Sequence, residues 1–351
     1  MKKIRALSLP LLFILLISSA CYAQQGEGIA PGCLRDVGDK GSLKDCCPGR
    51  TCVQTVQFRS KLVGATLPYK VILPTGYNPR ERAQTARFPV IYLLHGFAGH
   101  YDNWTTMSKL AEHASSYNFI IITPEGNNNW YTDSATVPAE KYESYILQEL
   151  IPEVQARFRA LETREGRAIA GLSMGGYGAL KFGFKHPEMF AFAASLSGAM
   201  DAASWVESDL RNFGAELPRS VMAAFGPAGS QTRAANDLVR IAREFPAERF
   251  NQLPYFYLDC GTEDFLIQTN RSFSALLLDR KIPHEFRQLP GTHNWAYWDM
   301  QVREVLRVAA QKIPQARLSS VARLQQSPSS TAFAIFHSTY QPSLTTFLPL
   351  R

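Results

Sequence analysis

The chain has 351 residues, of which 46% are hydrophobic and 19% charged, and its formal net charge is +7. This composition is typical of a globular protein with room for one sizeable domain. Three of the basic residues lie within 1–23 and five more lie beyond Glu304, so the body of the chain is close to neutral. It has no basic stripe of the kind that nucleic acid requires, and we expect no nucleic-acid partner.

Residues 1–23 have the pattern of a secretory signal peptide. A basic start is followed by an apolar run that ends at Ile17 and by small residues before Ala23. The apolar run is too short to span a membrane comfortably. We therefore expect a secreted or periplasmic protein. Lipid anchoring through Cys21 is the less favoured alternative, because Ser18 stands where a lipoprotein signal would have a branched apolar residue.

Residues 24–52 are polar and Gly-rich, and we expect an N-terminal extension outside the main core. This segment holds four of the six cysteines, namely Cys33, Cys46, Cys47 and Cys52. In an exported chain such crowding predicts disulfides, whose pairing the sequence leaves open. A zinc site is less favoured, because two separated Cys-x-x-Cys pairs are missing. Cys260 stands alone in an apolar run and is predicted to be a buried thiol.

Residues 53–314 alternate apolar runs with helical stretches. The runs predict eight strands: Val53–Ser60, Tyr69–Leu73, Pro89–Leu94, Phe119–Thr123, Arg167–Gly171, Phe190–Leu196, Tyr255–Asp259 and His284–Leu289. Helical patterns are found at Glu143–Phe158, Gly176–Phe184, Thr269–Asp279 and Trp295–Ala310. Continuous apolar strands alternating with helices predict an α/β domain, with a mainly parallel sheet of eight strands flanked by helices.

Two further segments depart from this alternation. Met200–Phe250 has no clear strand, and we interpret it as a small cap-like insertion near the site. Residues 315–351 are rich in Ser, Thr, Gln and Pro without a sustained period, which predicts a disordered or loosely attached tail.

The most informative motif is Gly-Leu-Ser-Met-Gly at 171–175, directly after a predicted strand. Gly-x-Ser-x-Gly on a strand-to-helix turn is the nucleophile elbow of serine hydrolases. The glycines permit a turn too tight for side chains, and the following helix N-terminus favours negative charge. Ser173 is therefore the candidate nucleophile, although the motif alone also fits an ordinary Gly-rich turn.

A base and an acid follow in the chain order expected of an α/β-hydrolase. Ser173 follows the fifth predicted strand, Asp264 the seventh and His293 the eighth. A serine hydroxyl needs a neighbouring base, and a carboxylate orients the imidazole that serves as that base. Asp259 and Glu263 compete with Asp264 for the acidic role, and we favour Asp264.

The developing oxyanion needs fixed hydrogen-bond donors. The backbone N–H groups of Phe97 and Met174 are the natural pair, one following the third predicted strand and the other following the nucleophile. We interpret the neighbouring His95 as structural. The remaining histidines and Cys260 form no ligand set, so no metal or organic cofactor is expected.

A resemblance emerges from five motifs taken together. They are Phe88–Gly96, Asp102–Trp104, Asn129–Ser134, Gly171–Gly176 and Gly291–Trp295. This set resembles the esterase D-like group of the α/β-hydrolase superfamily, which includes S-formylglutathione hydrolases, feruloyl esterases, tributyrin-type esterases and the antigen 85 mycolyltransferases. The resemblance covers roughly residues 53–312. It implies an α/β-hydrolase fold and places Trp104, Trp130 and Tyr131 near the substrate pocket.

These observations favour a secreted serine carboxylic-ester hydrolase that acts through an acyl-enzyme. The expected substrates are short-chain acyl, feruloyl or acetyl esters, either small molecules or linked to polysaccharide. An acyltransferase of the antigen 85 kind, which passes the acyl group to a sugar hydroxyl, is the alternative. A non-catalytic binding module is disfavoured because no triad member is missing. The sequence does not indicate an oligomeric state.

Overall fold

The computed structural model describes residues 34–36, 51–78, 86–206 and 208–314. The predicted signal peptide and tail lie outside the described residues, as do Cys21, Cys33, Cys46 and Cys47.

The core is a nine-stranded sheet in the order β1-β2-β3-β5-β4-β6-β7-β8-β9. The strands are β1 (Leu34–Asp36), β2 (Thr51–Arg59), β3 (Thr66–Leu73), β4 (Val90–Leu94), β5 (Ile120–Pro124), β6 (Arg167–Leu172), β7 (Phe192–Leu196), β8 (Tyr255–Gly261) and β9 (His284–Leu289). The run from β5 to β9 is parallel, and β3 is antiparallel to both of its neighbours. This confirms the predicted α/β fold with a mainly parallel sheet.

The predicted strand count needs one correction. All eight predicted strands form, but β1 adds a ninth by pairing in parallel with β2. Its residues fall within the segment 24–52 that was predicted to lie outside the core. Three residues are too few to show an apolar periodicity, so only the pairing with β2 identifies them as a strand.

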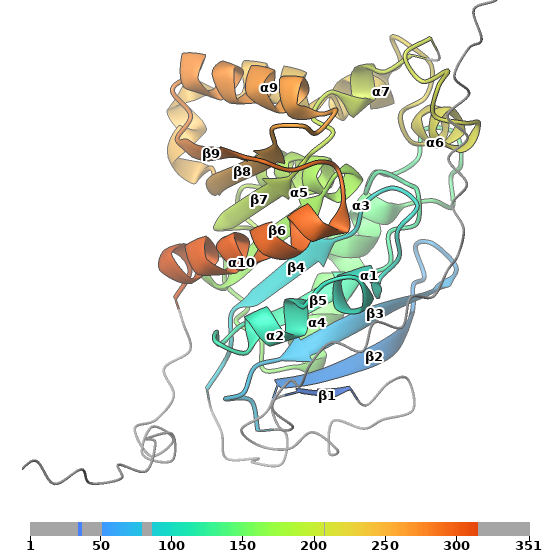
Figure 1. Cartoon of the computed structure of the whole chain (residues 1–351). Coiled ribbons are helices and arrows are strands. Elements are labelled where there is room, and N and C mark those ends of the chain that lie inside the picture. The colour runs from blue at the N-terminus through green and yellow to red at the C-terminus, as the bar shows by residue number, and fades with distance from the viewer. Residues whose placement is uncertain (1–33, 37–50, 79–85, 207, 315–351) are drawn as a thin grey trace, which may run out of the picture. The chain divides into compact units, whose positions relative to one another are not determined.

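Helices cover both faces of the sheet (Figure 1). They are α1 (Asn103–Thr106), α2 (Leu110–Ala114), α3 (Tyr142–Ser144), α4 (Ile151–Arg157), α5 (Met174–Lys185), α6 (Glu216–Phe225), α7 (Gln231–Ala235), α8 (Leu238–Glu244), α9 (Ile267–Asp279) and α10 (Trp295–Lys312). Side chains of α1, α2 and α10 join one buried apolar cluster, and those of α4, α5, α8 and α9 join another. Strands buried on both faces explain why β4 to β7 are continuous apolar runs.

The predicted helix over Glu143–Phe158 is present in three parts. A π-helical turn over Tyr145–Leu150 separates α3 from α4. Pro152 lies in the first turn of α4, where its missing N–H would have no partner within that helix. The wider turn thus accommodates the proline inside an otherwise continuous helical segment.

The insertion between β7 and β8 carries α6, α7 and α8, and Figure 1 places α6 and α7 beyond the carboxyl ends of the strands. Its organising residue is Arg233, which is buried. The guanidinium donates hydrogen bonds to the carbonyl oxygens of Ala203, Trp205 and Gly226. One cation therefore satisfies three backbone acceptors that the irregular chain leaves without a regular partner.

The two described cysteines are both buried. Cys260 lies in β8 and is a free thiol, as predicted. Burial raises its pKa well above the ordinary value, so it stays protonated. Cys52 lies in β2, and its three predicted companions lie outside the described residues, so the disulfide framework stays a prediction. No helix in the described ranges is long and apolar enough to cross a membrane.

Candidate active site

Ser173 occupies the sharp turn between β6 and α5. Its φ of +52° and ψ of −115° lie in a region that non-glycine residues rarely adopt. The flanking glycines are required by close backbone approach. A Cβ on Gly171 would lie 2.5 Å from the carbonyl carbon of Gly175, and one on Gly175 would lie 2.6 Å from the carbonyl oxygen of His95. The turn therefore packs against the end of β4 and projects the serine oxygen from the sheet.

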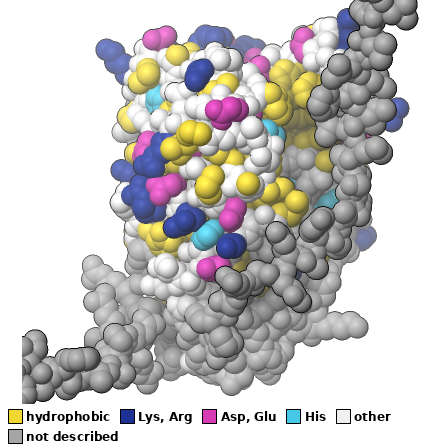
Figure 2. Space-filling view, viewed as in Figure 1, with side chains coloured by type: hydrophobic (Ala, Val, Ile, Leu, Met, Phe, Trp, Pro, Cys, Tyr) yellow, Lys and Arg dark blue, Asp and Glu magenta, His cyan; other side chains and the backbone are white. Residues whose placement is uncertain are grey.

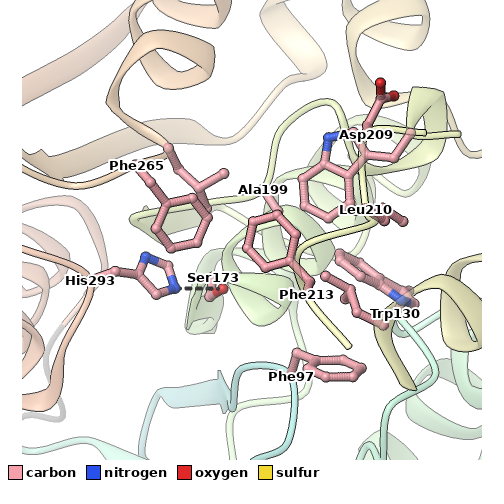
Figure 3. Close-up of a pocket in the computed structure, with 12 residues that line it drawn as sticks. Phe97, Trp130, Ser173, Ala199, Asp209, Leu210, Phe213, Phe265 and His293 are labelled. Atoms are coloured by element: carbon pink, nitrogen blue, oxygen red, sulfur yellow. Dashed lines mark hydrogen bonds between the residues drawn. The ribbon is translucent and has the colours of Figure 1, made fainter. Parts of the chain in front are cut away.

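The structure brings the three predicted residues into one hydrogen-bonded line. His293 Nε2 lies 3.0 Å from Ser173 Oγ, and His293 Nδ1 lies 2.9 Å from Asp264 Oδ2 (Figure 3 shows the first contact). They arrive from the carboxyl ends of three different strands, β6, β8 and β9. This edge is where ligands bind in open α/β sheets.

Asp264 is suited to stabilise a positive charge on His293. Its side chain is fully buried, which by itself would raise its pKa. The hydrogen bond and charge of His293, together with the backbone N–H of Leu266 at 2.8 Å, outweigh burial and hold the pKa below its ordinary value. The carboxylate therefore remains ionised beside the imidazole.

The two competing acids contact other groups. Glu263 is exposed and accepts a hydrogen bond from the backbone N–H of Gly291 at 2.5 Å. Asp259 is completely buried and accepts hydrogen bonds from the hydroxyls of Tyr297 and Tyr257, the latter at 3.2 Å. Burial raises the pKa of Asp259 to about 6, against the lowering effect of the two tyrosines.

The loop that carries His293 is held between β8 and α10. A Cβ on Gly261 would lie 2.2 Å from the carbonyl oxygen of Gly291, and one on Gly291 would lie 2.3 Å from the ring of Tyr297. Asn294 caps α10 by accepting a hydrogen bond from the backbone N–H of Tyr297 at 3.0 Å. Tyr297 therefore packs beneath the loop that carries His293, and its hydroxyl donates a hydrogen bond to Asp259.

The predicted oxyanion donors lie on either side of the nucleophile. The β4–β6 register pairs Leu94 with Gly171, so the loop after β4 runs beside the elbow. Among the described residues, the backbone N–H of Phe97 donates to no backbone acceptor, and that of Met174, the first residue of α5, has no partner within its helix. Both groups are therefore available to a substrate oxygen.

His95 does not reach the nucleophile. It is buried, its Nδ1 lies 2.8 Å from the carbonyl oxygen of Gly96, and its Nε2 accepts from the backbone N–H of Gly126 at 2.9 Å. These contacts join the loop after β4 to the loop after β5. The geometry agrees with the structural role predicted for this histidine.

A cavity of about 370 Å³ opens beside Ser173 and His293. Apart from these two residues and Asp209, its walls are apolar and mostly aromatic. They comprise Phe97, Trp130, Ala199, Trp205, Leu210, Phe213, Leu217, Phe265 and Leu266. Figure 2 shows hydrophobic side chains gathered on the side of the molecule where α6 lies. The size and the lining suit a small organic group held by a few polar atoms.

Only one of the three predicted pocket residues lines this cavity. Trp130 does, whereas Trp104 and Tyr131 are buried elsewhere. Trp104 belongs to the apolar cluster under α10 and donates its indole N–H to the carbonyl oxygen of Leu94 at 3.1 Å. The hydroxyl of Tyr131 donates to the carbonyl oxygen of His95 at 3.0 Å. Both side chains support the loops from beneath instead of facing substrate.

Sequence reasoning missed most of the pocket wall. Phe265 packs on the imidazole of His293, with ring centroids 4.6 Å apart, and Phe213 packs on Phe265 at 5.9 Å. Phe265 directly follows Asp264, and that adjacency could have identified it. The residues contributed by the insertion, such as Trp205 and Leu210, carry no comparable signal because their segment has no regular period.

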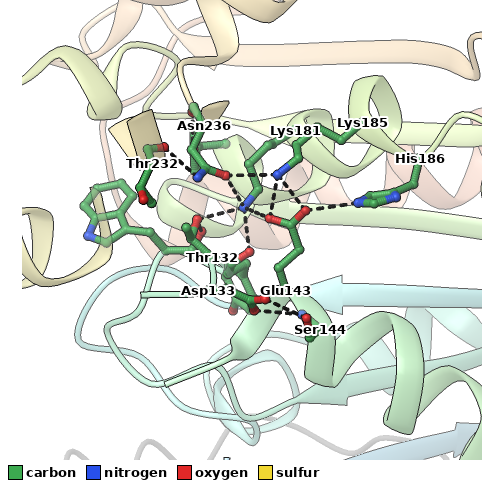
Figure 4. A network of polar contacts seen from close by, with 12 residues as sticks. Thr132, Asp133, Glu143, Ser144, Lys181, Lys185, His186, Thr232 and Asn236 are labelled. Carbon is green, nitrogen blue, oxygen red and sulfur yellow. Dashed lines mark hydrogen bonds and ion pairs between the residues drawn. The ribbon is translucent and has the colours of Figure 1, made fainter. Parts of the chain in front are cut away.

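A buried ionic network around Lys181 and Glu143 supports the loop that carries Trp130 (Figure 4), and Thr132 links the two by donating to the carbonyl oxygen of Trp130 at 3.0 Å. Lys181 of α5 is fully buried and donates to the carbonyl oxygen of Tyr131 and to Thr132 Oγ1, both at 2.7 Å, and to Glu143 Oε2 at 2.9 Å. Burial lowers the pKa of Lys181 to about 8, while the charge of Glu143 opposes that change. The network stabilises the left-handed φ angles of Trp130 and Tyr131, +57° and +52°.

Comparison with known families supports the chemistry of this arrangement. Residues 60–307 match the family model described as "Putative esterase". The chain belongs to this esterase family. It is accordingly an enzyme of the carboxylic-ester hydrolase class.

Individual relatives carry esterase names. The acetyl esterase of Caldicellulosiruptor saccharolyticus is 28% identical over 71% of this chain and 95% of that relative. Esterase Rv1288 of Mycobacterium tuberculosis (strain ATCC 25618 / H37Rv) is 30% identical over 68% of this chain, and the match spans about half of that longer protein (54%).

Among solved structures, a ferulic acid esterase superimposes with a TM-score of 0.62 at 28% identity, covering 75% of this chain and 99% of its own. A fluorophosphonate-binding serine hydrolase of Staphylococcus aureus, FphF, gives a TM-score of 0.66 at 26% identity, over 75% of this chain and 99% of its own.

Proposed function

We propose that this chain is a secreted serine esterase that cleaves carboxylic esters through a covalent acyl-enzyme at Ser173. The observation that carries the proposal is the hydrogen-bonded line from Ser173 through His293 to Asp264 beside an apolar cavity. Such a line supplies a nucleophile, a base and a group that orients the base.

In the first half-reaction, Ser173 Oγ attacks the ester carbonyl while His293 Nε2 takes the hydroxyl proton. The C–O bond to the alcohol then breaks, and His293 returns the proton to the leaving oxygen. In the second half-reaction, water repeats the attack on the acyl-enzyme, its proton passes to His293 and then to Ser173 Oγ, and the acid leaves. Asp264 stabilises the imidazolium in both halves.

The negative charge that develops on the carbonyl oxygen needs donors that are fixed beforehand. We assign this role to the backbone N–H groups of Phe97 and Met174, the latter at the N-terminus of α5. Removal of one such donor in a serine hydrolase costs about 3 kcal/mol of transition-state stabilisation.

The aromatic cavity supports esters with an apolar or aromatic acyl group, including feruloyl and short-chain acyl esters. Relatives are named acetyl esterase, endo-1,4-beta-xylanase/feruloyl esterase and ferulic acid esterase, which agrees with this range.

Transfer of the acyl group to a sugar hydroxyl instead of water is a second candidate function. It is favoured by 26% identity to a mycolyltransferase of Mycobacterium leprae. Product analysis with and without an added sugar acceptor separates the two reactions.

The decisive experiment compares Ser173→Ala with Ser116→Ala, a change at an exposed serine that does not line the cavity. We expect the first variant to lose hydrolysis of p-nitrophenyl acetate and labelling by a fluorophosphonate probe, while the second retains both. Hydrolysis that survives in Ser173→Ala would overturn the assignment of the nucleophile.

Export is proposed from the signal pattern of residues 1–23. Expression of the full chain should deliver activity to the periplasm or medium, whereas a chain without this segment should stay in the cytosol. Activity of the full chain that remains in the cytosol would contradict the proposal.

Thiol labelling of the exported protein, before and after reduction, tests the predicted disulfides among Cys33, Cys46, Cys47 and Cys52.

A further inference from the structure

A second cavity of about 350 Å³ lies next to the one that contains Ser173. Trp205 and Leu210 line both cavities, so they form the wall between them. The remaining walls of the second cavity come from the insertion, around α6.

The dividing wall is held by contacts at its edge. The indole N–H of Trp205 donates to Asp201 Oδ1 at 3.0 Å, and its ring meets Trp130 edge-on with centroids 5.6 Å apart. The side chain of Trp205 is only half-buried. Leu210, the other residue of the wall, is buried, so a rotation of Trp205 would open its part of the wall and leave Leu210 in place.

The chemistry of the second cavity selects an apolar occupant. Pro218, Val221, Met222 and Ala228 supply its apolar walls. The guanidinium of Arg233 also lines it, but that group already donates to three backbone carbonyl oxygens. These bonds use four of the five N–H groups of the buried cation, and the second cation on the wall, Arg219, is exposed. The buried part of the cavity is therefore mainly apolar.

The catalytic geometry decides which half of the ester points toward the second cavity. His293 must protonate the leaving alcohol, so the alcohol lies on the side of the imidazole. Figure 3 shows His293 and Phe265 on one side of Ser173, and Leu210 and Trp130 on the other. The acyl group therefore extends toward Leu210 and the shared wall.

We infer that the second cavity is an acyl subsite that takes the distal methylenes of a medium- or long-chain aliphatic acyl group once Trp205 moves aside. The inference rests on the proposed esterase function and extends its substrate class beyond acetyl and other short acyl groups. Each methylene that leaves water is worth up to about fourfold in kcat/KM.

The test blocks the second cavity and leaves the first intact. Met222 is 47% exposed and, of the two cavities, lines only the second. Met222→Trp can therefore fill that space without overpacking the hydrophobic core. Met107→Trp is the matched control, because Met107 is 50% exposed and lines neither cavity. kcat/KM is measured on p-nitrophenyl acetate, butyrate, octanoate and dodecanoate.

We expect the wild type and Met107→Trp to accept octanoate and dodecanoate. In Met222→Trp we expect kcat/KM on dodecanoate to fall by about tenfold or more, which corresponds to a few lost methylenes, and the acetate value to stay within about twofold. Trp205→Ala, which removes one of the two side chains of the wall, should raise the ratio of dodecanoate to butyrate hydrolysis.

Three results would overturn the inference. They are a wild-type profile that ends at butyrate, a chain-length profile unchanged by Met222→Trp, and a loss confined to long-chain alkyl acetates, where the chain is on the alcohol. Each leaves acetate hydrolysis intact. Failure of the proposed function would instead remove hydrolysis of every ester in the series.

Discussion

Asp259 is a buried acid at the end of β8 whose ionisation should be visible in the stability of the protein. Its pKa is about 6 in the folded chain, against an ordinary value of 3.8, because burial disfavours the charged form. The groups that face it are Tyr257 and Tyr297, together with the pair Arg287 and Glu304. Asp259→Asn replaces it with a neutral side chain of nearly the same shape.

The size and direction of the effect follow from linkage. Between pH 3.8 and about 6 the folded state binds more protons at Asp259 than the unfolded state does, so its contribution to the free energy of unfolding falls as pH rises. The pKa in the folded state lies about two above that in the unfolded state, which corresponds to about 3 kcal/mol in the free energy of unfolding. This contribution is lost once the pH is well above 6. The asparagine variant has no such loss.

Urea denaturation of the wild type and of Asp259→Asn, at pH 4 to 8, measures this difference directly. Other acids titrate in both proteins and cancel in the comparison. Between pH 4 and pH 7.5 we expect the free energy of unfolding of the variant to rise relative to that of the wild type by about 2.4 kcal/mol, because part of the full effect already lies below pH 4. Asp279→Asn, at an exposed position of α9, should show no comparable trend. A difference that stays constant within about 0.5 kcal/mol over this range would refute the reasoning.

Three further predictions concern the site and its supports. Asp264→Asn should lower kcat about 10⁴-fold with little change in melting temperature, because an amide stabilises the wrong imidazole tautomer; a loss below tenfold would contradict the role of the carboxylate. Lys181→Met should lower the free energy of unfolding, measured by urea denaturation, by about 3 kcal/mol, because it removes one partner of a buried ion pair. Adding Glu143→Gln should recover part of that loss. Strictly additive effects of the two changes would exclude coupling between the two side chains. Trp130→Ala should alter the ratio of octanoate to acetate hydrolysis, whereas Trp104→Phe should lower the melting temperature and leave that ratio unchanged; equal effects of both changes on the ratio would contradict the pocket boundary.

The sequence predicted the parts of the fold that depend on local pattern. Continuous apolar runs identified the parallel strands because a strand buried on both faces has no polar side to show. The chain order of Ser173, Asp264 and His293 was readable because each follows a strand that ends at the same edge of the sheet. The additional strand β1 was not readable, since three residues carry no period.

The tertiary structure alone decided which neighbours of these motifs face substrate. Trp104, Trp130 and Tyr131 all lie in motifs that carry the family resemblance, yet of the three only Trp130 lines the cavity. The side of its loop that a side chain faces depends on packing against α5 and α10. The insertion that supplies Trp205, Leu210 and Phe213 is held by Arg233 through backbone carbonyls, and such contacts leave no pattern in side-chain polarity. The sequence by itself therefore determined the catalytic set, whose members follow regular strands, while the shape of the acyl-binding wall required long-range packing of an irregular segment.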